Sequence, residues 1–259
     1  MSPQKIVPSP CSFSSASTCR PWLRLSHFLH LALIGSAFFL GACAGPGLTS
    51  YRKGDYPKAL REFQKDPSPK GDFAVGVMQF KGEGTDRAPE EAALSFQRAA
   101  ERGHAGAQYN LGVLYLRGEG VQRDREESAR WFREAAERGD VKAQVNLGLQ
   151  YAMGDGVEKD LGEAVHWFTK AAKRGYPKAQ ICLGKLYAYG AGVARDRNMA
   201  AYWFRRAAEQ GSLQGQLFLG VMYAEGEGVE KDREAAASWF RKAQEQGSLQ
   251  AKWYLDHLE

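Results

Sequence analysis

The sequence predicts an all-α solenoid, a row of stacked helix pairs with about five similar units and about eleven helices. Two observations carry this prediction: marker residues recur at a fixed interval of 36, and each unit has the pattern of two helices. Solenoids have such fixed periods because each unit buries its apolar face against its neighbours. The markers are a tryptophan, a Leu-Gly pair, a tyrosine and an aspartate (Trp131, Trp167, Trp203, Trp239; Leu111, Leu147, Leu183, Leu219; Tyr115, Tyr151, Tyr187, Tyr223; Asp124, Asp160, Asp196, Asp232).

One unit, residues 140–175, shows why two helices are expected. Ala143, Leu147 and Tyr151 recur at steps of four and give the first helix one apolar stripe. Glycines then end that helix, and Asp160 is placed to cap a second helix by accepting backbone N–H bonds. The second helix has a wide apolar face, formed by Ala164, Trp167, Phe168, Ala171 and Ala172.

The glycine-rich element between the two helices is interpreted as a helix stop. RGEGV at 117–121 has the look of a phosphate loop, but related stretches recur in the other units. The Gly-Lys-Ser/Thr of a phosphate-binding loop is absent. Its middle residue also changes from unit to unit, as Glu119, Asp155, Ala191 and Glu227, which argues against a repeated metal ligand.

The first 42 residues are predicted to be a lipoprotein signal peptide. Residues 28–40 form an apolar run that is too short for a membrane-spanning helix, which needs about 20 residues. The run follows Arg20 and Arg24 and ends in small residues, as in secretory signals. Leu40-Gly41-Ala42-Cys43 resembles the bacterial lipobox, in which the cysteine is lipidated and becomes the new N-terminus. An ordinary cleaved signal with an incidental cysteine is the alternative.

The formal charge of +5 comes mostly from this leader, which has three basic residues and no Asp or Glu. Without it the net charge is +2, and the remainder has no Lys/Arg run, so no nucleic-acid partner is expected. Beyond Cys43 only Cys182 remains, and a lone cysteine cannot form an intrachain disulfide. Its place on an apolar helical stretch favours buried packing.

The pattern A-x-A-Q-x-x-L-G-x-x-Y-x-x-G-x-G-V-x-x-D, followed by A-x-x-W-F-x-x-A-A-x-x-G, resembles the Sel-1-like repeat, a relative of the tetratricopeptide repeat. The resemblance implies a right-handed α-α solenoid of about five Sel-1-like repeats, a tetratricopeptide-like superhelix. Residues 51–65 resemble the helical half of a tetratricopeptide unit and are expected to cap the array. The predicted organisation is a signal peptide at 1–42, the lipidated cysteine and a short linker at 43–50, and a repeat domain at 51–259, with repeats at 70–103, 104–139, 140–175, 176–211 and 212–247 and a closing helix at 248–258.

No catalytic or metal-binding constellation is recognised, and no cofactor is expected. The three histidines after Cys43, His104, His166 and His257, occupy different repeat positions. Neither HExxH nor paired cysteines occur.

The candidate binding surface is the groove that first helices line in related solenoids. By analogy with the tetratricopeptide pattern, groove positions are the fifth and second residues before each marker leucine and the second and sixth after it. The candidates chosen from these positions are Tyr109, Arg117, Lys142, Met153, Lys178, Lys185, Tyr189 and Gln214. Four of them are basic and give the middle of the groove a positive bias, which Glu225 opposes near the end. Ordinary solubilising charge is the alternative interpretation.

The resemblance implies a non-catalytic protein–protein interaction scaffold, because the family is a scaffold family. Lipid at Cys43 would hold it in the bacterial cell envelope, and Ala44 in place of Asp favours the outer membrane, facing the periplasm. The expected partner is another envelope protein or an extended peptide, close to the membrane because the linker is short. The alternatives are an envelope enzyme or peptidoglycan-fragment binder, and a secreted effector that binds host proteins.

Overall fold

The computed structural model describes residues 45–258. The predicted signal peptide and Cys43 lie outside this range. The described residues form helices only, with no strand: α1 (Pro46–Arg52), α2 (Tyr56–Gln64), α3 (Pro69–Lys81), α4 (Pro89–Glu101), α5 (Ala105–Arg117), α6 (Arg125–Glu137), α7 (Val141–Met153), α8 (Leu161–Lys173), α9 (Pro177–Tyr189), α10 (Arg197–Glu209), α11 (Leu213–Glu225), α12 (Arg233–Glu245) and α13 (Leu249–Asp256).

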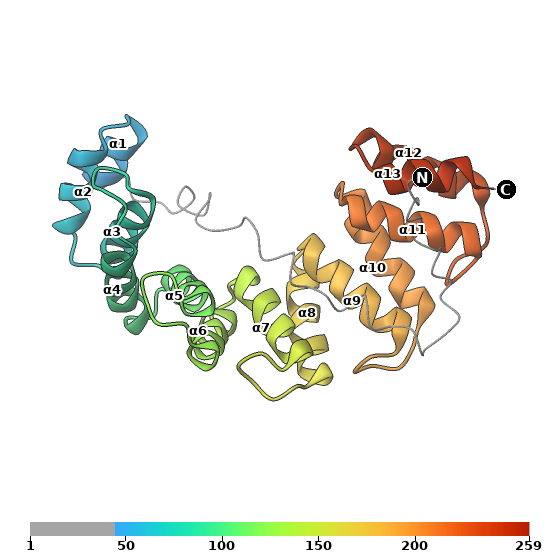
Figure 1. The fold of residues 1–259 in the computed structure, drawn as a ribbon, viewed down its shortest axis with the longest axis horizontal. Coiled ribbons are helices and arrows are strands. Elements are labelled where there is room, and N and C mark those ends of the chain that lie inside the picture. The colour runs from blue at the N-terminus through green and yellow to red at the C-terminus, as the bar shows by residue number, and fades with distance from the viewer. Residues whose placement is uncertain (1–44, 259) are drawn as a thin grey trace, which may run out of the picture. The chain divides into compact units, whose positions relative to one another are not determined.

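Consecutive helices pack as hairpins, and the hairpins follow one another in a row (Figure 1). The five repeats pair α3 with α4, α5 with α6, α7 with α8, α9 with α10, and α11 with α12. Each second helix also packs against the first helix of the next hairpin. The all-α solenoid of five repeats is confirmed. Residues 45–258 contain thirteen helices rather than about eleven, since α1 and α2 add a hairpin before the first repeat.

The chain becomes helical earlier than the sequence suggested, at Pro46 instead of near Tyr51. Proline suits the first turn of a helix, where its missing N–H has no partner to lose. Two side chains connect α1 to later parts of the chain. The Ser50 hydroxyl donates to Glu62 on α2 at 2.7 Å, and the Tyr51 hydroxyl donates to Glu83 at 2.9 Å. Residues expected to form a linker therefore belong to the folded cap.

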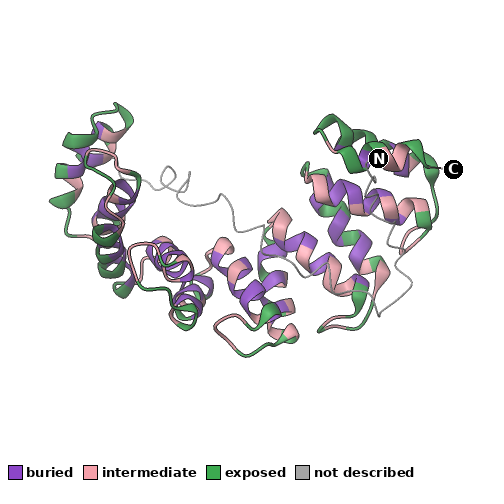
Figure 2. Cartoon of the chain, in the orientation of Figure 1, coloured by how far each residue is buried: buried purple, intermediate pink, exposed green. Residues whose placement is uncertain are grey.

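The core of each hairpin is a phenylalanine ring that packs against a helical glycine. Phe96, Phe132, Phe168, Phe204 and Phe240 are fully buried. A Cβ on the facing glycine of the first helix would lie 2.6–2.8 Å from the ring, which is too close for any side chain. This contact explains the glycine of each Leu-Gly pair, because only a bare backbone lets the ring approach. Figure 2 shows the buried residues running along the helices of every hairpin.

The two glycines of the Gly-x-Gly element have different roles. Gly154 ends α7 in the left-handed conformation (φ 72°), and its N–H donates to the Gln150 carbonyl. Gly156 is also left-handed (φ 77°), but a Cβ on it would overlap the carbonyl oxygen of Arg125 on α6. The helix stop is therefore the first glycine. The second lets the loop touch the preceding repeat, a role that the sequence did not reveal.

In two units the middle residue of Gly-x-Gly pairs with the preceding second helix. Asp155 forms an ion pair with Arg125 at 2.7 Å, and Glu227 forms one with Arg197 at 2.9 Å. Where Leu161 replaces the arginine, alanine replaces the acid at 191. Glu119 departs from this pattern, since it pairs at 3.4 Å with Arg87, which precedes α4.

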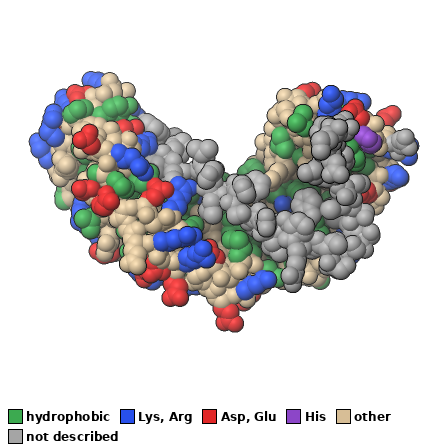
Figure 3. Space-filling view, viewed as in Figure 1, with side chains coloured by type: hydrophobic (Ala, Val, Ile, Leu, Met, Phe, Trp, Pro, Cys, Tyr) green, Lys and Arg blue, Asp and Glu red, His purple; other side chains and the backbone are tan. Residues whose placement is uncertain are grey.

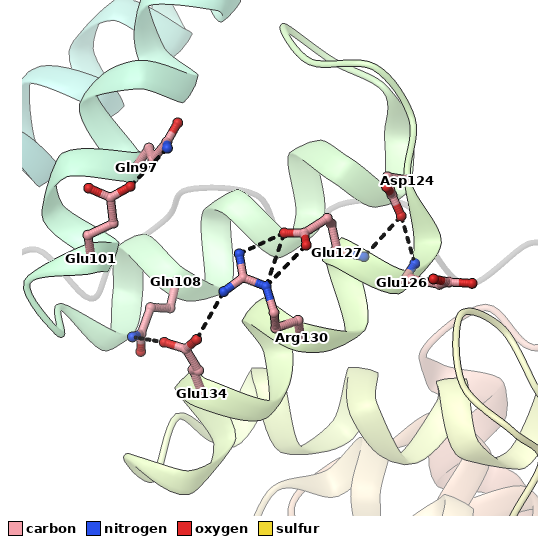
Figure 4. Close-up of polar contacts among 8 residues, drawn as sticks. All are labelled: Gln97, Glu101, Gln108, Asp124, Glu126, Glu127, Arg130 and Glu134. Carbon is pink, nitrogen blue, oxygen red and sulfur yellow. Dashed lines mark hydrogen bonds and ion pairs between the residues drawn. The ribbon is translucent and has the colours of Figure 1, made fainter.

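Buried glutamines connect each first helix to the helix before it. The side-chain amides of Gln108, Gln144 and Gln180 donate to the carbonyls of Ala100, Ala136 and Ala172. These carbonyls belong to the last turn of a helix, and each also accepts the backbone N–H of the glycine three residues later, Gly103, Gly139 or Gly175. Figure 4 shows Gln108 also bonding Glu134, and Asp124 capping α6 through the N–H groups of Glu126 and Glu127.

α13 matches the pattern of a first helix but lacks the position that accepts a phenylalanine. Asp256 stands where Gly220 stands in α11, and Lys252 replaces the buried Gln216. A side chain at 256 would block the ring of a further second helix packed in the same way. The closing role of this helix stays a prediction.

Candidate partner-binding face

The first helices α3, α5, α7, α9 and α11 share one side of the row, which we call the first-helix face. α9 contacts α11 directly. Side chains also bridge successive first helices. The Phe73 ring on α3 stacks on His104, the N-cap residue of α5, with centroids 4.4 Å apart. Lys142 of α7 places its Nζ 6.0 Å from the Tyr109 ring centroid on α5.

Part of the predicted groove is used for packing between repeats. Tyr109 is only 8% exposed, and its ring packs against Phe132. Val145, Ile181 and Leu217, at the same repeat position, are buried as well. Tyr109 therefore offers a partner little surface. Its ring instead supports the Lys142 side chain of the next repeat.

The outer edge of the face is more accessible. Met153 is 40% exposed and Tyr189 is 43% exposed, at the same position of successive repeats. Arg117, at this position in α5, is half-buried and lies 3.6 Å from Glu119. Gln214 is half-buried on α11, and Glu225 is exposed at its end.

The lysines of the face are half-buried, and Lys142 and Lys185 lie beside aromatic rings. Lys142 and Lys178 occupy the same position in consecutive repeats. Lys185 lies two turns beyond Lys178 on α9, with its Nζ 5.0 Å from the Phe218 ring centroid on α11. Burial lowers the pKa of Lys185. In Figure 3, basic side chains gather over the middle of the row, between α5 and α7, next to hydrophobic ones.

Residues at the cap position before each first helix also belong to the face, and the sequence interpretation missed them. Asp140 caps α7 by accepting from the Ala143 N–H at 2.8 Å. Burial raises the pKa of its carboxyl group. The pKa of Tyr109 rises to about 12, mainly by burial and also through the negative charge of Asp140. Tyr176 shows the same two effects on its pKa. The 36-residue period could have indicated these cap residues, since it places one residue directly before each first helix.

Cys182 is half-buried on α9, so the predicted buried packing is not fully reached. Burial raises its pKa, which disfavours the reactive thiolate, although Lys185 and Lys178 oppose that shift.

His104 has a structural role that the sequence did not suggest. Its Nδ1 accepts the Ala107 N–H at 3.1 Å and so caps α5. Only the neutral ring can accept this bond. Burial, and then the charge of Lys70, lower the pKa of His104.

This cap predicts a specific dependence of stability on pH. Because the folded state binds the proton less tightly, the contribution is complete above about pH 6.5, the ordinary histidine value, and falls as the pH drops toward the lowered pKa. A helix cap is worth about 1 kcal/mol. His104→Ser introduces the residue that caps α11, Ser212, which does not titrate in this range. The substitution should therefore remove the part of the stability loss at low pH that comes from protonation of His104. Thermal melts at pH 7.5 and 5.0 test it, and equal losses in both proteins would contradict the prediction.

Within residues 45–258, no group of three or more His, Cys, Asp or Glu residues could hold a metal ion. In the same range, no helix has the length and apolar character needed to cross a bilayer.

These features define an α-solenoid repeat protein with an accessible first-helix face. The Sel1 repeat model matches residues 69–104, 105–140, 141–176, 177–212 and 213–248, and the chain belongs to the Sel1 repeat family. Sel1 repeat proteins generally mediate protein–protein interactions and form a non-catalytic scaffold family. Among curated proteins, none matches the chain.

Two solved structures resemble the chain over most of its length. A protective antigen of uropathogenic Escherichia coli strains with an SLR fold is 34% identical, with a TM-score of 0.79. That match covers 81% of this chain and 47% of the antigen, so the chain spans about half of the antigen's length. A Sel1 repeat protein from Oxalobacter formigenes is 32% identical, with a TM-score of 0.76, and the match covers 79% of this chain and 86% of that one.

Proposed function

We propose that this protein is a non-catalytic docking scaffold, held by lipid at Cys43 in the bacterial cell envelope, that binds a partner protein on its first-helix face. The observation that carries the docking proposal is the composition of this face. Exposed Met153 and Tyr189 belong to the same face as the half-buried lysines, and Lys185 lies one turn before Tyr189 on α9, so apolar and charged contacts are available together. Such a mixture is typical of protein-binding surfaces, where large apolar side chains act as anchors.

The lipid anchor is supported by Leu40-Gly41-Ala42-Cys43 and by the apolar run before it. Only Ala44 and Gly45 separate Cys43 from Pro46, the first residue of α1. The distance from Cys43 to Pro46 is then at most about 10 Å when this stretch is fully extended. A lipidated chain would keep its N-terminal cap at the membrane surface, so we expect the partner to be membrane-proximal. Outer-membrane residence, facing the periplasm, is the location we propose.

Photo-crosslinking in intact bacteria tests both parts of this proposal. A crosslinking amino acid at Tyr189 should capture a defined envelope protein. The same group at Tyr202, which is 47% exposed on the second helix α10, should not capture it. Cys43→Ser should abolish incorporation of labelled palmitate and release the chain from the membrane fraction. Equal adducts from both tyrosine positions would refute docking on the first-helix face, and palmitate that survives the substitution would refute the anchor.

A further inference from the structure

The first helices in the middle of the row carry basic side chains and no acidic ones. α5, α7 and α9 contain Arg117, Lys142, Lys178 and Lys185 and no Asp or Glu. The second helices α6, α8 and α10 carry both signs, with eight Lys or Arg residues and six Glu residues. Ordinary solubilising charge has both signs, as these second helices do. The absence of Asp and Glu from the three first helices therefore points to a requirement of the first-helix face.

Two of the lysines on this face are positioned by aromatic rings instead of by carboxylates. Lys142 reaches across to Tyr109 of the preceding first helix, and Lys185 reaches across to Phe218 of the next. Cation–π contacts of this kind orient an ammonium group and leave its N–H donors available. Across residues 45–258, no carboxylate forms an ion pair with Lys142, Lys178 or Lys185.

The nearby acid is already engaged. Asp140 interacts electrostatically with Lys142. Its carboxylate also accepts the Ala143 N–H at the start of α7. Lys185 is partly desolvated, with the Cys182 thiol as the titratable group that acts on it. Lys178 and Lys185 are half-buried and form no ion pair within the described part of the chain, so they gain most from an anion that arrives with a partner.

The spacing of the lysines fits a chain in an extended conformation. Lys142 and Lys178 occupy equivalent positions of α7 and α9, and α8 packs against both of these helices. Lys178 and Lys185 are two helical turns apart on α9, which is about 10 Å. An extended peptide rises about 3.3 Å per residue, so three of its residues span the interval between Lys178 and Lys185.

We propose that the first-helix face binds an extended acidic segment of a partner protein, with carboxylates that meet Lys142, Lys178 and Lys185. The carboxylates that meet Lys178 and Lys185 would be about three residues apart in the segment. This inference rests on the proposed docking function and adds the chemistry of the partner. The chain's own N-terminal residues 1–44 are excluded as the occupant by charge, since they contain Lys5, Arg20 and Arg24 and no Asp or Glu.

Selection of peptides from a phage-displayed library of random 12-residue sequences tests the inference without knowledge of the partner. The full-length protein serves as bait at low salt, where charge contacts are least screened. The recovered peptides should be rich in Asp and Glu at intervals of about three. Recovery of peptides without acidic residues, or of none, would overturn the acidic inference. Crosslinking at Tyr189 would still report on docking itself, so the two proposals can fail separately.

Fluorescence anisotropy with one recovered peptide then locates the contact. Substitution of Lys142, Lys178 and Lys185 by Gln should weaken binding about tenfold or more, because each lost contact contributes to a shared site. Substitution of the exposed Lys159, Lys173 and Lys231 by Gln changes the net charge equally and should leave the affinity within about twofold. Helical circular dichroism confirms folding of both variants. Equal losses of affinity in the two triple variants would overturn the proposal. A second copy of this chain on the face, detected as a dimer by light scattering, would also overturn it.

Discussion

Trp167→Ala should destabilise the repeat domain by about 3–5 kcal/mol, the range for truncating a large buried aromatic side chain. Trp167 lies on α8 and is 6% exposed. Its Nε1 donates to Glu163 at 3.1 Å, and the Lys170 Nζ lies 4.5 Å from its ring centroid. The substitution therefore removes apolar packing, a hydrogen bond and a cation–π contact together. Chemical denaturation followed by circular dichroism measures the change.

Trp239→Ala is the matched control, because Trp239 occupies the same position in the last repeat and is less buried. It should cost clearly less than Trp167→Ala. Since repeats interact mainly with their neighbours, the weakened repeat can unfold before the others and broaden the transition. An unchanged melting curve for Trp167→Ala would mean that the tryptophan row does not hold the second helices in place.

Gly156→Ala should be about as damaging as loss of the tryptophan, although it adds only one methyl group. The left-handed conformation costs an alanine about 1–2 kcal/mol. The methyl group would also overlap the Arg125 carbonyl, and forced overpacking costs about 1–3 kcal/mol more. The combined loss is about 2–5 kcal/mol, measured by the same denaturation experiment.

Gly211→Ala separates these two causes. Gly211 has a similar φ of +81°, but nothing lies within 4 Å of its Cβ position. It should therefore show only the conformational cost. If both substitutions destabilise equally, the close approach between the loop and the preceding repeat contributes nothing to stability.

The sequence predicted those parts of the fold that depend on the period and on local backbone rules. The aspartate caps illustrate this, since Asp160 accepts the N–H groups of Gly162 and Glu163 at the start of α8 as expected. α1 was missed because Gly45, Pro46 and Gly47 resemble a linker, and its helix depends on contacts such as Ser50 with Glu62. Local propensity contains no information about that tertiary contact.

The candidate site could be predicted only as far as the analogy with tetratricopeptide repeats places residues on a face. It identified Met153 and Tyr189, which are exposed, but also Tyr109, which is buried between repeats. Degree of burial depends on the tilt of neighbouring helices, which a period does not specify. The rings that position Lys142 and Lys185 come from other repeats, so no single stretch of sequence indicates them.

The pairs between Arg125 and Asp155 and between Arg197 and Glu227 have a consequence for how such chains can be shuffled. A hairpin excised from the start of its first helix to the end of its second carries half of one pair and half of the next. A segment cut from the start of a second helix through the following Gly-x-Gly, such as 161–192, keeps both partners of its contact, here Leu161 and Ala191. The segment that recombination can transfer with its contact intact is therefore offset by half a repeat from the structural hairpin.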